Sequence, residues 1–95
     1  MTHFLLLKFE DGFFSDEIFR LAQAIFSQLS KEVPAVGETA VLRNCIVREV
    51  NADLLVRMEL SRDGMKEYLE HPLHRRFVDT VDSHVVRRMS FDCEN

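Results

Sequence analysis

Hydrophobic residues recur with two periods along this chain, and each period predicts one type of secondary structure. A period of two residues, which is typical of β-strands, runs through residues 3–10, 54–60 and 84–92. We expect a further strand over residues 36–48, which end shortly before the turn at Asn51 and Ala52. The pattern therefore predicts four strands.

Helical periodicity is found in two segments between these strands. Ser15 is a suitable N-cap for the first helix, whose apolar residues continue to Leu29, and Pro34 marks its end. The second helical segment begins at Ser61 and is interrupted by Pro72, because proline lacks the N–H that a helix interior needs. Proline suits the first position of a new helix, so we expect a short helix, a break and a second helix.

The expected order is strand, helix, strand, strand, helix pair, strand. This order is typical of a ferredoxin-like α+β fold, in which a four-stranded antiparallel sheet carries its helices on one face. The strand order across such a sheet is 4-1-3-2, with the first and third strands in the centre.

The other face of the sheet is expected to be covered by a second copy of the chain. The first strand is apolar on both sides, with Leu5 on one face and Phe4 on the other. Val85, Met89 and Phe91 add a second apolar row on the last strand. Since a large exposed apolar surface usually marks an interface, we expect a homodimer.

Composition narrows the class of protein further. A chain of 95 residues predicts a single domain over residues 1–95, and its 46% hydrophobic content predicts a globular fold. The net charge of −4 argues against nucleic-acid binding, which needs a basic face. The apolar run at residues 4–7 is too short for a membrane span or a signal peptide, so we expect a cytoplasmic protein. Cys45 and Cys93 would lie on opposite edge strands, and we expect two reduced thiols.

The residues around Pro72 carry the candidate chemistry. His74 lies in the first turn of the second helix, where the helix dipole disfavours imidazolium, so a neutral ring that can accept a proton is expected. His74 shares an inward apolar face with Phe77, and Tyr68 faces inward from the helix before the break. A neutral imidazole and a phenol facing the same core could transfer protons.

Other interpretations of these residues stay open. A histidine in a first helical turn is often a capping or hydrogen-bonding group, and tyrosine is an ordinary core residue. His71 and His74, three positions apart, could form half of a metal site. A zinc site needs three or four ligands, and no further ligand motif is present, so we expect no metal.

Several segments together resemble one known family. Residues 3–9 resemble the opening histidine, hydrophobic, Lys-Phe strand of the stress-responsive A/B-barrel (Dabb) family, and residues 68–77 are similar to its Y-x-x-H-P-x-H-x-x-F signature. The turn at residues 51–54 and the end of the chain at residues 88–92 also resemble bacterial members. The resemblance implies that two ferredoxin-like subunits face each other as a dimeric α/β barrel.

The resemblance also implies an activity. One family member, a plant olivetolic acid cyclase, closes a linear poly-β-keto thioester into an aromatic acid without a cofactor. Its catalytic pair corresponds to Tyr68 and His74 here, and a pocket histidine corresponds to His3. We expect ligand contacts from His3, His71, Phe77 and Arg88, and no cofactor.

Two functions therefore stand at this point. The first is a cofactor-independent cyclase, isomerase or lyase that acts on a small carbonyl or aromatic compound. The second is a non-catalytic stress-response or ligand-binding protein in which the His-Pro motif is structural. Arg88 and Ser90 make one strand face more polar than in the plant cyclase, so the same substrate is not expected.

Overall fold

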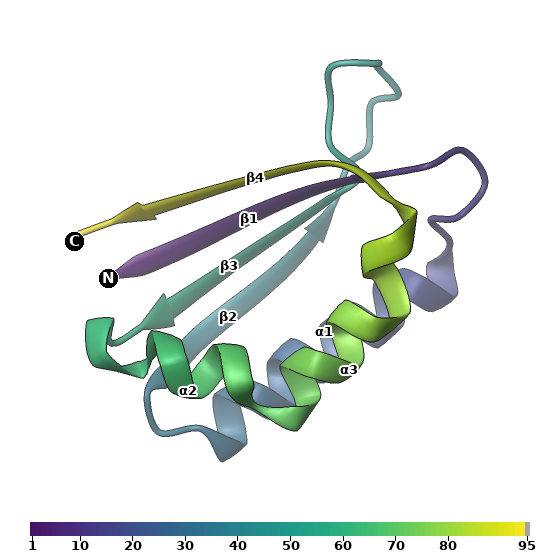
Figure 1. Cartoon of the computed structure of the whole chain (residues 1–95). Coiled ribbons are helices and arrows are strands. Elements are labelled where there is room, and N and C mark those ends of the chain that lie inside the picture. Colours follow the sequence, from purple (N-terminus) through teal and green to yellow (C-terminus); the bar gives the residue numbers. More distant parts are fainter. Residues whose placement is uncertain (95) are drawn as a thin grey trace.

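The computed structural model describes residues 1–94, which form one antiparallel sheet and the helices that cover it (Figure 1). The elements follow one another as β1 (Thr2–Phe9), α1 (Asp16–Glu32), β2 (Val36–Arg43), β3 (Leu54–Leu60), α2 (Met65–Glu70), α3 (Pro72–Val81) and β4 (Val85–Cys93). Single 3₁₀ turns at Arg62–Gly64 and Asp82–His84 precede α2 and β4.

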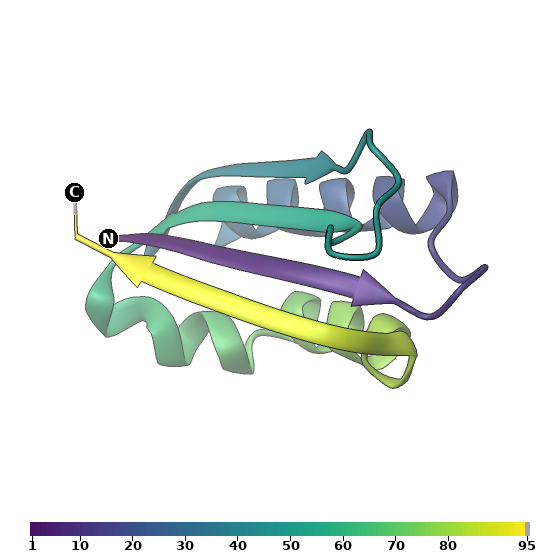
Figure 2. The same cartoon turned by 90° about the horizontal axis from the view of Figure 1, so that it is seen from above.

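The sheet has the order β2-β3-β1-β4, and every pair of neighbouring strands is antiparallel. Figures 1 and 2 show all three helices on the same side of this sheet. The structure therefore confirms the ferredoxin-like α+β fold that the periodicity predicts. Within residues 1–94, no helix is both long and apolar enough to cross a bilayer.

Local signals explain where α1 begins and ends. The Ser15 side chain accepts a hydrogen bond from the backbone N–H of Ile18 at 3.3 Å, and acidic residues occupy the first turn, where the helix dipole favours them. Val33 has an extended backbone and ends the helix. The helix packs against the sheet through four buried residues, Ala22, Ile25, Phe26 and Leu29.

The break at Pro72 has the expected form. α2 ends at Glu70, and His71 has an extended backbone with φ −67° and ψ 139°. The His71 ring then accepts a hydrogen bond from the N–H of Leu73 at 3.1 Å, so this histidine is the N-cap of α3 and Pro72 is its first residue. After the break, α3 continues along the sheet from α2 and packs beside α1, as Figure 1 shows.

Alternate residues of β1 face opposite layers. Leu7 and Phe9 are buried under the helices. On the other side, which we call the bare face, Phe4 pairs across the strands with Phe91, and their ring centroids are 6.2 Å apart. Phe91 is 63% exposed in the single chain, and Met89 on the same strand is 66% exposed. The helices leave this second apolar layer uncovered.

The strand expected over residues 36–48 is shorter in the structure: β2 ends at Arg43, so the expected end at residue 48 is wrong. Side-chain amides compete with the strand ladder beyond that point. The Asn44 amide donates to the carbonyl of Ile46, and the Asn51 amide donates to the side-chain oxygen of Asn44 at 3.1 Å. Cys45 therefore lies in a loop, residues 44–53, and not on an edge strand; its thiol and that of Cys93 are free, as predicted.

Candidate functional site

A cavity of about 200 Å³ lies between the sheet and the α2–α3 pair. Five of the six residues predicted to contact a ligand line it: His3, Tyr68, His74, Phe77 and Arg88. They come from β1, α2, α3 and β4, so the fold brings together side chains that are distant in sequence. The rest of the wall is apolar apart from Ser90 and is formed by Leu5, Leu7, Leu69, Val78 and Val81.

Tyr68 is the most buried polar side chain of this cavity, with 1% of its surface exposed. Its ring centroid lies 4.5 Å from that of His74, and the two rings are inclined at 60°. Burial raises the pKa of the Tyr68 hydroxyl far above its ordinary value, because the phenolate would lose its hydration. The hydroxyl therefore stays protonated and can act as a hydrogen-bond donor.

The Tyr68 hydroxyl has no hydrogen-bond partner among the described residues. The same part of the chain contains no fully buried side-chain oxygen or nitrogen that lacks a partner. The Tyr68 hydroxyl is therefore not completely buried, and Tyr68 lines the cavity. A molecule in the cavity could accept its hydrogen bond.

His74 is held in a defined orientation and tautomer. Its Nδ1 lies 3.0 Å from the carbonyl oxygen of Leu69, and since a carbonyl can only accept, Nδ1–H donates. In the neutral ring, Nε2 then carries the lone pair. Burial is the largest cause that lowers the pKa of His74 from 6.5, and the nearby charge of Arg88 also lowers it, while the hydrogen bond to Leu69 acts in the opposite direction. The direction of this shift favours the neutral ring that the helix dipole leads one to expect. Its main cause in the structure is burial.

His3 forms a second polar contact at the cavity wall. It is the cross-strand partner of Asp92, and its Nδ1 lies 2.5 Å from the Asp92 carboxylate. The carboxylate orients the ring, which is also in edge contact with Tyr68 at a centroid distance of 6.1 Å. Sequence reasoning missed Asp92, although the register of an antiparallel pair would have placed it opposite His3.

Arg88 and Phe77 contribute in different ways. Arg88 is half exposed and forms an ion pair with Asp82, so its charge at the cavity edge is partly neutralised. Phe77 is buried and contacts Phe26 edge to face at a centroid distance of 5.2 Å. Phe77 therefore connects the cavity wall to the hydrophobic core.

His71 is placed differently from the other predicted residues. It does not line the cavity, and its ring nitrogen caps α3 through Leu73. Across the part of the chain that the structure describes, no group of three His, Cys, Asp or Glu side chains is arranged to hold a metal ion. In this arrangement, a neutral imidazole can accept a proton from a bound molecule, and a protonated phenol can donate a hydrogen bond to it.

Comparisons with solved structures reveal the same fold in several proteins. A dimeric ferredoxin-like protein of unknown function from Thermobifida fusca YX is 21% identical with a TM-score of 0.76, over 95% of this chain and 85% of that one. A dimeric ferredoxin-like protein of unknown function from Jannaschia sp. CCS1 is 19% identical with a TM-score of 0.77, over 99% and 97%. The hydroxynitrile lyase of Passiflora edulis is 10% identical with a TM-score of 0.73, over 95% and 87%.

No match was found among curated proteins. The family model of the stress responsive A/B barrel domain, by contrast, matches residues 1–95. This match agrees with the strand order and with the helix break at Pro72 described above. The chain therefore belongs to the stress responsive A/B barrel domain (Dabb) family.

Proposed function

We propose that this chain is a cofactor-independent cyclase, isomerase or lyase that moves a proton on a small carbonyl or aromatic compound, with Tyr68 and His74 as the catalytic pair. The observation that carries the proposal is the contact between the two rings at 4.5 Å on the wall of one cavity. One ring is held neutral with an available lone pair, and the other keeps a hydroxyl proton that no described residue binds.

The geometry suits enolisation. Nε2 of His74 would remove a proton from the carbon next to a carbonyl. The electrons of that C–H bond would form a carbon–carbon double bond, and the π electrons of the carbonyl would move to its oxygen. The Tyr68 hydroxyl would donate a hydrogen bond to the oxygen as its negative charge develops. The protonated His74 would then return the proton to another atom of the product, which completes an isomerisation or assists ring closure or bond cleavage.

The cavity restricts the size of the substrate. Its volume of about 200 Å³ is below the range of about 300–1,000 Å³ that is usual for drug-sized ligands. A compact carbonyl compound fits such a space better than a long polyketide. His3, oriented by Asp92, and the cation Arg88 would contact polar groups of the substrate. The fold is compatible with lyase chemistry, since the Passiflora edulis hydroxynitrile lyase shares it.

We also infer that two copies of the chain join through their bare faces as a dimeric barrel in the cytoplasm. Leu42, Met89 and Phe91 are each more than half exposed in the single chain, and burying such groups stabilises an interface. Both bacterial neighbours reported above are described as dimeric. Two free thiols suit a reducing compartment.

A second function is supported by a separate observation. Both histidines of the His-Pro motif make structural contacts: His71 caps α3, and His74 binds the Leu69 carbonyl across the break. The motif could thus serve only to fix the helix break in a ligand-binding or stress-response protein without catalytic activity. This alternative predicts ligand binding without turnover.

A thermal-shift screen of small keto acids, phenolic acids and acyl thioester mimics tests the proposed site. It should include Tyr68→Phe and His74→Asn, because asparagine can keep the hydrogen bond to Leu69 while it removes the base. His84→Asn is the matched control, since His84 pairs with Glu10 outside the cavity. At least one carbonyl compound should stabilise the wild type and the control more than the two cavity variants. Failure of every compound to stabilise the wild type would contradict the proposal.

A further inference from the structure

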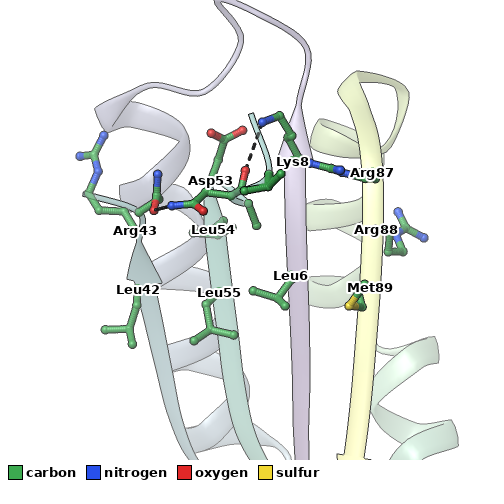
Figure 3. A pocket seen from close by; sticks show the side chains of 14 residues that line it. Leu6, Lys8, Leu42, Arg43, Asp53, Leu54, Leu55, Arg87, Arg88 and Met89 are labelled. Carbon is green, nitrogen blue, oxygen red and sulfur yellow. Dashed lines mark hydrogen bonds between the residues drawn. The ribbon is translucent and has the colours of Figure 1, made fainter. Parts of the chain in front are cut away.

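A second and larger cavity lies on the bare face, on the opposite side of the sheet from Tyr68 and His74. Its volume is about 480 Å³, and the loop at residues 44–53 forms one of its walls. Figure 3 shows its apolar floor, to which every strand contributes one residue: Leu42 of β2, Leu55 of β3, Leu6 of β1 and Met89 of β4. These residues are consecutive cross-strand partners, so they form one continuous apolar row.

Two cations meet at the loop end of this row. Lys8 and Arg87 are direct cross-strand partners, and like charges in that position destabilise a sheet. The Lys8 ammonium donates to the carbonyl oxygen of Glu49 at 2.6 Å, and Arg87 donates to the same oxygen at 2.8 Å. No carboxylate among the described residues forms an ion pair with either side chain. Both positive charges thus share the Glu49 carbonyl, and backbone carbonyls rather than carboxylates face them.

The other charged groups near the cavity are engaged elsewhere. Arg43 pairs with Asp16, and Arg88 pairs with Asp82 on the helix side; Figure 3 shows both guanidinium groups pointing away from the apolar row. The carboxylate of Asp53 accepts the backbone N–H of Phe9 at 2.8 Å. Among the residues that line the cavity, there are therefore two cations without an ion-pair partner and one carboxylate.

Arg87 has unused binding capacity. One of its terminal nitrogens is bound to the Glu49 carbonyl, and none of its remaining N–H groups has a partner within residues 1–94. A guanidinium presents its donors in a planar fork that matches a carboxylate. Lys8, in contrast, already donates to the carbonyls of Arg48, Glu49 and Asn51, and would contribute mainly its charge.

We propose that this second cavity binds a small amphipathic carboxylate. The carboxylate would bind Arg87 beside Lys8, and the apolar body would lie along the row from Met89 toward Leu42. In the single chain, the cavity volume falls within the usual range for small-molecule sites, about 300–1,000 Å³. The inference does not depend on the catalytic proposal, because the two cavities lie on opposite faces of the sheet and share only Arg88, which this proposal does not use. In a dimeric barrel, the site would lie between the two sheets.

Isothermal titration of the intact protein with octanoate tests this site, with neutral octanamide as the uncharged analogue. Octanoate should bind the wild type, and Arg87→Met should weaken that binding about tenfold or more, as the loss of a charged hydrogen bond predicts. Octanamide should bind the wild type more weakly than octanoate does. It should bind Arg87→Met as well as it binds the wild type. Arg57→Met is the matched control, because Arg57 is an exposed cation of the same face that does not line the cavity. The control should retain octanoate binding.

A measurement that needs no variant accompanies the titration. Octanoate added to labelled wild-type protein should shift the amide resonances of residues 44–53 and the methyl resonance of Met89. No heat and no shifts with octanoate would overturn the proposal. Equal weakening by Arg57→Met and Arg87→Met would also overturn it, because attraction to surface charge would then explain the binding. Shifts confined to Tyr68, His74 and their neighbours would assign the ligand to the first cavity instead.

Discussion

Replacing Tyr68 by phenylalanine should leave the stability of the fold almost unchanged. The ring packs between His3, Phe26 and His74, so its apolar contacts remain in the variant. The hydroxyl has no described hydrogen-bond partner, so its removal does not forfeit the roughly 0.5–1.5 kcal/mol that an intramolecular hydrogen bond contributes. We expect the free energy of unfolding to change by less than about 0.5 kcal/mol.

Thr39→Val is the matched control for this prediction. The Thr39 hydroxyl donates to the carbonyl of Phe26 at 3.2 Å in a partly buried position. Removing it should cost about 1 kcal/mol, because the hydrogen bond of a partly buried hydroxyl is lost. Urea unfolding followed by circular dichroism, at one fixed protein concentration, measures both variants.

The comparison would refute the reasoning if Tyr68→Phe lost as much stability as Thr39→Val or more. That result would mean that the Tyr68 hydroxyl has a structural partner and is not available to a bound molecule. A neutral effect on stability, combined with weaker ligand binding or slower turnover, would support its role in the cavity.

Three further predictions concern assembly, pH and the helix break. Light scattering should give about twice the chain mass of 11.1 kDa, and Met89→Asp should give monomers; a wild-type monomer would contradict the barrel. Burial lowers the pKa of His74 below 6.5, so the unfolded chain binds this proton more tightly. The stability contributed by neutral His74 is present above pH 6.5 and is lost as the pH falls toward the pKa of His74 in the folded protein. The thermal unfolding temperature of His74→Asn should therefore depend less on pH, between about 7 and 5, than that of the wild type. Pro72→Ala should cost on the order of 1 kcal/mol in urea unfolding, and a loss of all secondary structure would show that the proline does more than start α3.

Much of the fold could be predicted because its signals are local. Ser15 caps α1, Pro72 begins α3, and the apolar alternation of β1 identifies both of its faces. The order of these elements then selects one common topology. The inward positions of Tyr68 and His74 followed from helical spacing alone, and both line the cavity.

The features that the sequence analysis missed depend on contacts between distant segments. Asp92 reaches His3 only because β4 pairs with β1, which joins residues 89 positions apart. A strand was expected as far as residue 48, whereas amide hydrogen bonds within the loop at residues 44–53 replace the strand after Arg43. The second cavity needs that loop, the sheet register and the convergence of Lys8 and Arg87 on Glu49, none of which a single segment predicts.

Deuterium exchange of an α-proton, followed by proton NMR, tests the catalytic claim most directly. A carbonyl compound that stabilises the wild type in the thermal-shift screen should lose its α-proton signal in D₂O faster with the protein than without it. His74→Asn should slow this exchange about 10²–10⁴-fold, as the loss of a general base predicts, while His84→Asn should exchange at the wild-type rate. Equal exchange rates for the wild type and His74→Asn, with the compound bound to both, would contradict the account and leave a binding protein whose His-Pro motif is structural.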